Sequence, residues 1–107
     1  MIVLPRMYEA LVITPVKDSL NTTIETIQSI CKSEGNFLYC IYNDFSTDET
    51  TQNLKRIQQQ YNFELINLSE ITNTPSPNYR FVLQMAQKKA LQLSIPLIIV
   101  FLNQDFS

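Results

Sequence analysis

The chain has 107 residues but no histidine and only one glycine, Gly35. Without histidine it cannot build a histidine-ligated zinc or haem site, or a catalytic triad that uses an imidazole base. With one glycine it cannot form the glycine-rich loop of a P-loop or of a dinucleotide-binding Rossmann motif, because each needs several glycines. A phosphate-bearing ligand would therefore have to be held by side chains and a divalent cation.

Positive charge and long apolar runs are also scarce. Eight Lys and Arg against ten Asp and Glu give a net charge of -2, and the absence of a basic run disfavours binding to nucleic acid. The longest dense apolar run, 95–102, contains Pro96 and is far shorter than the roughly 20 residues that span a bilayer. Cys31 and Cys40 lack the paired spacing of a zinc site, so we interpret them as buried free thiols in a reducing cytosol.

Short apolar runs alternate with helical stripes along the chain. The strand-like runs are 10–14, which Pro15 should close, 37–42, 63–68 and 97–102. Helical spacing of apolar residues follows Asp18-Ser19, which offer the N-cap of a first helix and, in the case of Asp18, also an edge carboxylate. Gly35 is the expected C′ residue of that helix, with a positive φ. A second helix is expected after a cap at Ser46 or Thr47, and a third over 79–93. The last strand is apolar throughout, as a strand buried on both faces would be.

This order predicts an α/β fold, a three-layer Rossmann-like arrangement with a mostly parallel sheet of about four strands and helices on both faces. Ligands of such sheets bind beyond the carboxyl ends of the strands. The polar segments 14–18, 43–46 and 103–105 follow three of those ends. Carboxylates there could accept a hydrogen bond from a base or ribose, bind a hard cation or perform acid–base catalysis. Asp and Asn are also common helix caps and turn residues, and we interpret Asp48 as a helix N-terminal charge.

Three segments resemble motifs of the N-terminal half of family 2 inverting glycosyltransferases with the GT-A fold. They are Val12-Ile-Thr-Pro-Val-Lys-Asp, Tyr39-Cys-Ile-Tyr-Asn-Asp-Phe-Ser-Thr-Asp-Glu-Thr and Phe101-Leu-Asn-Gln-Asp. The family patterns are I-P-x-Y-N, V-D-D-G-S-x-D-x-T and F-L-D-x-D, and residues 84–90 fall where the family has an N-x-G-x-x-x-A helix. The middle motif is the most specific, and the resemblance covers residues 10–107.

The resemblance implies that residues 1–107 form the nucleotide-sugar-binding part of a GT-A domain. Such an enzyme transfers a sugar with inversion from a nucleotide diphosphate sugar, commonly a UDP-sugar, to an acceptor hydroxyl. Asp44 would accept the imide N–H of a pyrimidine, and Asp105 would bind Mg²⁺ or Mn²⁺. The nucleotide-binding residues implied are Thr14, Pro15, Lys17, Asn43, Asp44, Arg80 and Asn103.

The resemblance also bears on the catalytic base. In this family the base lies downstream of the third motif, so we expect it downstream of Ser107, the last residue of the chain. We therefore expect the isolated chain, a piece of a longer enzyme or a natural truncation, to be inactive in transfer.

The same resemblance suggests an acceptor glycan or lipid-linked sugar, and a place in the biosynthesis of cell-envelope polysaccharide. We expect a cytoplasmic protein, with the inner-membrane surface as an alternative location. The apolar last strand at a sheet edge would favour self-association into a homo-oligomer.

The chain also departs from the family pattern. Asn43 and Asn103 replace the first Asp of the second and third motifs, and each keeps a carbonyl acceptor but loses the charge. Phe45 and Glu49 replace usual glycines, and Lys17 stands where an aromatic residue or Asn is common. The missing glycines and the two Asp-to-Asn changes favour an alternative hypothesis, in which the chain is a non-catalytic α/β interaction module that retains the fold.

Overall fold

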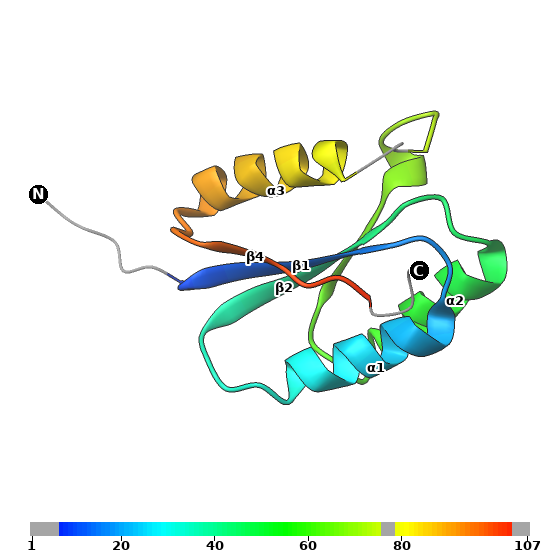
Figure 1. Cartoon of the computed structure of the whole chain (residues 1–107), viewed down its shortest axis with the longest axis horizontal. Helices are drawn as coiled ribbons and strands as arrows, with labels where there is room; N and C mark the ends of the chain where they lie inside the picture. The colour runs from blue at the N-terminus through cyan, green and yellow to red at the C-terminus, as the bar shows by residue number, and fades with distance from the viewer. Residues whose placement is uncertain (1–6, 76–78, 104–107) are drawn as a thin grey trace, which may run out of the picture.

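The computed structural model describes residues 7–75 and 79–103, which form strands and helices in alternation (Figure 1). All the paired strands run parallel, and the predicted α/β fold with a four-strand parallel sheet is confirmed. No helix in these ranges is both long enough and apolar enough to cross a membrane. In chain order the elements are β1 (Ala10–Val16), α1 (Leu20–Cys31), β2 (Phe37–Asn43), α2 (Asp48–Ile57), β3 (Glu64–Asn67), the 3₁₀ turn η1 (Leu68–Glu70), α3 (Arg80–Leu93) and β4 (Ile98–Val100).

The strand order is β3-β2-β1-β4. The chain therefore moves outward in one direction from β1 to β3, and α3 then carries it back across the sheet to the other side of β1. Helices α1 and α2 cover one face and α3 covers the other (Figure 1). This reversal places a topological switch point at the carboxyl ends of β1 and β4, where open α/β sheets bind ligands.

Alternate residues of the two central strands face opposite layers, because successive side chains of a strand point to opposite faces. Leu11 and Ile13 of β1 pack with Val82 and Ala86 of α3, whereas Val12 faces the α1–α2 layer. Every residue of β1 is buried. A strand buried on both faces needs an apolar side chain on each, which explains the continuous apolar run.

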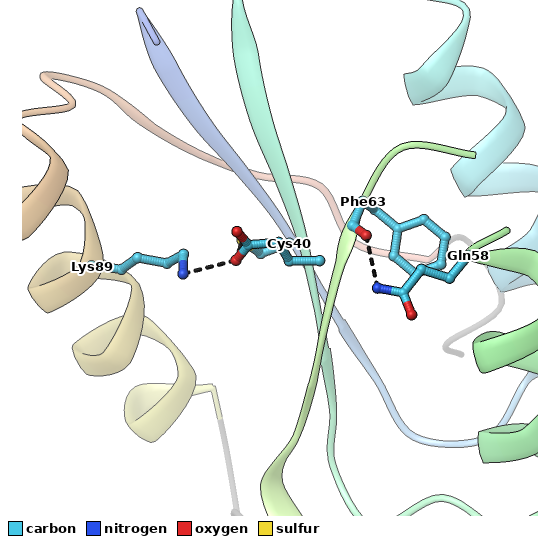
Figure 2. Close-up of polar contacts among 5 residues, drawn as sticks. Cys40, Gln58, Phe63 and Lys89 are labelled. Atoms are coloured by element: carbon cyan, nitrogen blue, oxygen red, sulfur yellow. Dashed lines mark hydrogen bonds and ion pairs between the residues drawn. The ribbon is translucent and has the colours of Figure 1, made fainter. Parts of the chain in front are cut away.

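The layers are also joined by polar contacts around β3 (Figure 2). The ammonium Nζ of Lys89 on α3 lies 2.8 Å from Oε2 of Glu64 on β3, and the Cys40 thiol donates to the same oxygen at 3.7 Å. Burial, with the Glu64 charge as a second cause, raises the pKa of Cys40 to about 12. The thiol therefore stays protonated at neutral pH. Both cysteines are free, as predicted, but Cys31 is half-buried rather than buried.

The first strand does not end at Pro15, as its sequence suggested, but continues to Val16. Alternate residues of β1 direct their backbone groups to β4: the Leu11 N–H donates to the Leu97 carbonyl, and the Phe101 N–H donates to the Ile13 carbonyl, each at 2.8 Å. Pro15 is next in this series and has no N–H to donate. Pairing with β4 therefore ends here, while pairing of β1 with β2 continues.

The prediction that the last strand is buried on both faces is wrong. The strand is only Ile98–Val100 and forms the edge of the sheet, with β1 as its neighbour. Leu97, Ile99 and Val100 are 53%, 41% and 40% exposed. An apolar run alone does not distinguish a central strand from an edge strand. In the described part of the chain, β4 is an edge strand and its outer side faces solvent.

Two details at the ends of α1 also differ from expectation. Gly35 has the positive φ, 138°, that was predicted for it, but it lies beyond the C′ position, because the C-cap of α1 is Lys32. Ser19 is the N-cap, yet its side chain makes no capping hydrogen bond. Its backbone φ of 57° is left-handed, which places it outside the usual N-cap geometry.

Candidate functional site

The carboxyl edge of the sheet is also where the three α-helices of the described chain begin (Figure 1). Each helix follows a strand and runs back across the sheet, so its N-terminus lies near that strand's carboxyl end. The free N–H groups and the dipole of a helix N-terminus favour negative charge. This edge is therefore suited to an anionic ligand although the chain has no glycine-rich loop.

The loops after β1 and β2 are joined by a reciprocal pair of hydrogen bonds. Asp18 accepts from the Thr47 backbone N–H at 2.8 Å, and the Asp18 backbone N–H donates to Ser46 Oγ at 2.7 Å. The hydrogen bond from the Thr47 N–H, the largest cause, lowers the pKa of Asp18. Thr47, one of the two caps that the sequence allowed, in turn caps α2, with its side chain accepting from Thr50 N–H. One carboxylate thus fixes how the two loops lie relative to each other.

This clamp contains backbone in the left-handed region. Asp18 and Phe45 have φ of 59° and 57°. Such a conformation costs a residue with a side chain about 1 kcal/mol or more, and persists where surrounding contacts over-determine it. Phe45 stands where the second family motif has glycine. The left-handed backbone is therefore kept here without the residue that adopts it most readily. The half-buried Phe45 side chain packs against the α3-side core and contributes to holding it.

Asp44 follows β2 directly and is half-buried at this edge. Its backbone N–H donates to the Val16 carbonyl at 2.7 Å, which extends the β1–β2 pairing by one bond. This bond fixes the Asp44 backbone beside the end of β1.

Two other predicted residues are exposed. Lys17 lies in the loop that follows β1, and Arg80 is the first residue of α3. Asp44, Lys17 and Arg80 are the predicted site residues whose side chains remain accessible.

Thr14 and Pro15 lie within β1 and are buried. Thr14 has no exposed surface, and its Oγ1 lies 2.8 Å from Tyr39 Oη. Burial raises the pKa of the Tyr39 phenol, which keeps it protonated as a hydrogen-bonding partner. The Thr14 side chain thus occupies the interior of the α1–α2 side rather than the accessible edge.

Asn43 is 3% exposed at the end of β2. Its Nδ2 donates to Thr51 Oγ1 on α2 and to Asn67 Oδ1 on β3, both at 2.9 Å. A neutral amide supplies both of these N–H donors, which an ionised carboxylate cannot do. The Asn43 Oδ1 has no hydrogen-bond partner within the described ranges. The side chain therefore ties β2, β3 and α2 together beneath Asp44.

Asn103 follows β4 and is buried against α1. Its Oδ1 accepts from Thr26 Oγ1 and its Nδ2 donates to Thr23 Oγ1, both at 2.9 Å. The amide that replaces the first Asp of the third motif is thus engaged by a helix.

Two predictions fall on the end of the chain, where the structure describes no residue after Asn103. Asp105, the predicted metal ligand, lies outside the described residues, and so does Ser107, beyond which the catalytic base was expected. Neither the metal ligand nor the position of the base is therefore tested, and both stay predictions. In the part of the chain that is described, no cluster of three or more Asp, Glu or Cys side chains could hold a cation.

The predicted site residues that the structure describes lie at one edge of the sheet, but only some of their side chains are accessible to a ligand. The register pairs Val16 with Asn43, which brings the ends of β1 and β2 together. Lys17, Asp44 and Arg80 can meet a ligand, whereas the side chains of Thr14, Asn43 and Asn103 are buried. Sequence reasoning identified Asp18 only as an edge carboxylate or cap, and its bond to Thr47 crosses between two loops. The sequence feature that could have indicated this bond is that both loops follow strands expected to be parallel neighbours.

Comparison with protein families gives one result. A family model described as Glycosyl transferase family 2 matches residues 11–107, a range that contains all the predicted site residues. No curated protein and no solved structure matches the chain.

Proposed function

Since the chain belongs to glycosyl transferase family 2, we propose that it forms the nucleotide-sugar-binding part of a transferase that acts on a UDP-sugar with inversion. The observation that carries this proposal is the clamp between the loops after β1 and β2. It holds Asp44 beside the end of β1, at the edge where the helix N-termini favour anionic groups. A nucleotide diphosphate has both a base that needs a hydrogen-bond acceptor and a strong negative charge.

Each accessible side chain has a role in this proposal. The Asp44 carboxylate accepts a hydrogen bond from the imide N–H of the uracil. The Asp44 backbone is fixed by its own N–H, which donates to the Val16 carbonyl. Lys17 and Arg80 lie on the loop after β1 and at the start of α3, and their charges attract the diphosphate from two sides. The buried amides of Asn43 and Asn103 support the loops rather than contact the ligand.

The family typically uses a divalent cation. We assign Mg²⁺ or Mn²⁺ to Asp105 together with the diphosphate oxygens, because Mg²⁺ is commonly bound through one or two carboxylates and substrate phosphates. The described residues alone do not supply such a set of ligands. The acceptor we propose is a glycan or lipid-linked sugar, at the cytoplasmic side of the cell envelope.

Calorimetric titration with UDP in the presence of Mn²⁺ tests the proposal. The unmodified chain should bind, and Asp44→Ala should weaken binding at least about tenfold, since a charged hydrogen bond contributes about 1.5–3 kcal/mol. Asp48→Ala is the matched control, because Asp48 is exposed in the first turn of α2 and should leave UDP affinity unchanged. Equal loss in both variants, or no binding of UDP by the unmodified chain, would count against the proposal.

The second candidate is a non-catalytic interaction module, favoured by one observation. The Asn103 amide is buried and hydrogen-bonded to Thr23 and Thr26, in a place where the family has a carboxylate. A module of this kind would keep the fold and bind no nucleotide. A cooperative unfolding transition together with no response to UDP, ADP or GDP would support it over the first proposal.

A further inference from the structure

A groove of about 630 Å³ lies on the α3 side of the sheet, between α3 and the outer strand β3. Its walls are mainly apolar and come from β2, β3, α3 and the end of η1: they are Tyr42, Ile66, Ile71, Phe81 and Met85. Ligand pockets have volumes of about 300–1,000 Å³. The groove is therefore large enough to receive several side chains of a partner.

Part of this apolar surface is left uncovered. Ile71 is 54% exposed, and Ile66, Phe81 and Met85 are only half-buried, although these three pack against the core beneath α3. A recessed apolar surface that is only partly covered gains free energy when a partner removes the rest of it from water.

One margin of the groove is a free strand edge. The strand partner of β3 is β2, and no backbone group of Glu64–Asn67 bonds to a segment outside the sheet within the described ranges. The outward N–H and C=O groups of such an edge can pair with an extended segment of another chain. Glu64 and Ile66 of β3 face α3, whereas Leu65 packs on the opposite layer. Alternate side chains of a strand added to β3 would therefore enter the groove.

The polar rim of the groove is positively charged. Lys88 and Lys89 of α3 line it, and no Asp or Glu of the described chain does. Lys89 is engaged by Glu64 at 2.8 Å, near the start of β3 (Figure 2). Lys88 is exposed and makes no ion pair in the part of the chain that the structure describes. A carboxylate is therefore the complementary group for this end of the groove, in a chain whose net charge is -2.

We propose that the groove is a docking site for an extended, acidic segment of another protein, which adds to β3 as a further strand. Alternate apolar side chains of the segment pack on Ile66 and Met85, and an acidic side chain on the same face meets Lys88. In this mode the main-chain hydrogen bonds supply affinity and the side chains supply specificity. The proposal does not depend on nucleotide binding, because none of the predicted site residues lines the groove.

Fluorescence anisotropy with the full chain tests the proposal. The probe is a labelled, end-capped peptide in which Val alternates with Thr and the Val-bearing face ends in one Glu. It is made in both chain orders, because an added strand can run parallel or antiparallel to β3. At least one order should bind with a Kd below about 1 mM. No binding of either order up to that protein concentration would overturn the proposal.

A pair of N-methylated peptides tests the pairing with β3. One is methylated at the backbone nitrogens of its Val residues and the other at those of its Thr residues, since alternate residues of a strand direct their N–H groups to opposite edges. Methylation of the set that faces β3 should weaken binding at least about tenfold, and methylation of the other set should leave it nearly unchanged. Equal effects of the two would show that no strand is added to β3.

Exposed positions of the groove locate the binding without disturbing the core. Lys88→Glu should weaken binding of the Glu peptide about fivefold, and a peptide with Lys in place of Glu should regain it on this variant. Lys55→Glu, at an exposed position of α2 on the other layer, is the matched control and should change nothing. Ile71→Asn should weaken both peptides about fivefold. Binding that is unchanged in Lys88→Glu and Ile71→Asn would place the peptide elsewhere and overturn the assignment.

Two further outcomes would give the groove another occupant and overturn the proposal. Decanoate carries a carboxylate and an apolar chain but cannot pair with β3. Binding of decanoate that is lost in Lys88→Glu, with no binding of any peptide, would indicate a site for an alkyl carboxylate. Self-association that is lost in Ile71→Asn, again without peptide binding, would indicate a second copy of this chain.

Discussion

The Asp18 carboxylate accepts a hydrogen bond from the backbone N–H of Thr47, a residue 29 positions later in a different loop, at 2.8 Å. Thr47 is the N-cap of α2, so the start of that helix is positioned from the neighbouring loop as well as by its own cap. The contact makes the β1–α1 and β2–α2 loops one unit. A ligand that contacts either loop therefore meets a surface that both of them define.

Removing this carboxylate should destabilise the fold in a pH-dependent way. Asp18→Ala should lower the free energy of unfolding by about 1 kcal/mol at neutral pH, as loss of a cap does. The pKa of Asp18 is lowered in the folded state, so its contribution is present above the unfolded pKa of about 3.9 and is lost as the pH falls through the folded pKa. Urea unfolding of both proteins at pH 7 and at low pH measures this.

The expected result is a stability difference at pH 7 that shrinks in acid. Asp48→Ala serves as a control for the loss of a carboxylate near the same helix N-terminus without the cross-loop bond. A difference of the same size at both pH values would show that the Asp18 charge is not what stabilises the clamp.

The hydrogen bond between Asn103 and Thr23 of α1 should make the effects of substituting these two residues on the free energy of unfolding non-additive. Asn103→Ala, Thr23→Val and the double variant form a cycle, and the interaction energy should be about 0.5 kcal/mol or more, because the two side chains share a buried hydrogen bond of 2.9 Å. Denaturant unfolding of the four proteins gives the value. Additive effects would mean that the Asn103 amide N–H does not bind Thr23, and would leave that donor available for the ligand.

The exposed edge strand should promote self-association of the isolated chain. Ile99 and Val100 of β4 and the preceding Leu97 are exposed apolar residues along this edge, and unpaired strand edges readily join another chain. Val100→Lys should raise the dissociation constant of the homo-oligomer at least about tenfold, because edge lysines oppose strand pairing. Light scattering over a concentration series measures this change.

The control for this experiment is Leu91→Lys on α3. Leu91 is the most exposed large apolar residue of the described chain, at 81%, but it lies on a helix and has no free strand edge. Association that weakens equally in both variants would indicate a general apolar effect. A monomeric mass of the unmodified chain at high concentration would contradict the prediction directly.

Much of the fold could be predicted because its signals are local. Apolar periodicity located α1 and α3 within a residue or two, and the polar cluster after β2 narrowed the cap of α2 to Ser46 or Thr47, of which the structure has Thr47. The parallel sheet followed from the order of elements, since helices between short apolar strands imply crossover connections. Each of these inferences depends on residues that are close together in sequence.

The site was harder to predict because its contacts are distant in sequence. Asn103 bonds to Thr26, 77 residues earlier, and nothing near Asn103 shows that its amide is engaged. The same holds for β4, since an apolar run does not reveal how many neighbouring strands it has. The resemblance to the family placed the residues at the correct edge. It could not distinguish the accessible side chains of Asp44 and Lys17 from the buried side chains of Thr14 and Asn43.

Pro15 has a consequence for the shape of the carboxyl edge. Had this residue an N–H, the register of Ile13 with Val100 would direct it to the carbonyl of Phe101, and the two strands would pair for one more step. A single missing hydrogen atom therefore lets the chain after β4 turn away from β1 toward α1, where Thr23 and Thr26 receive Asn103. The point at which these two strands separate is set by the ring of one proline rather than by the loops around it.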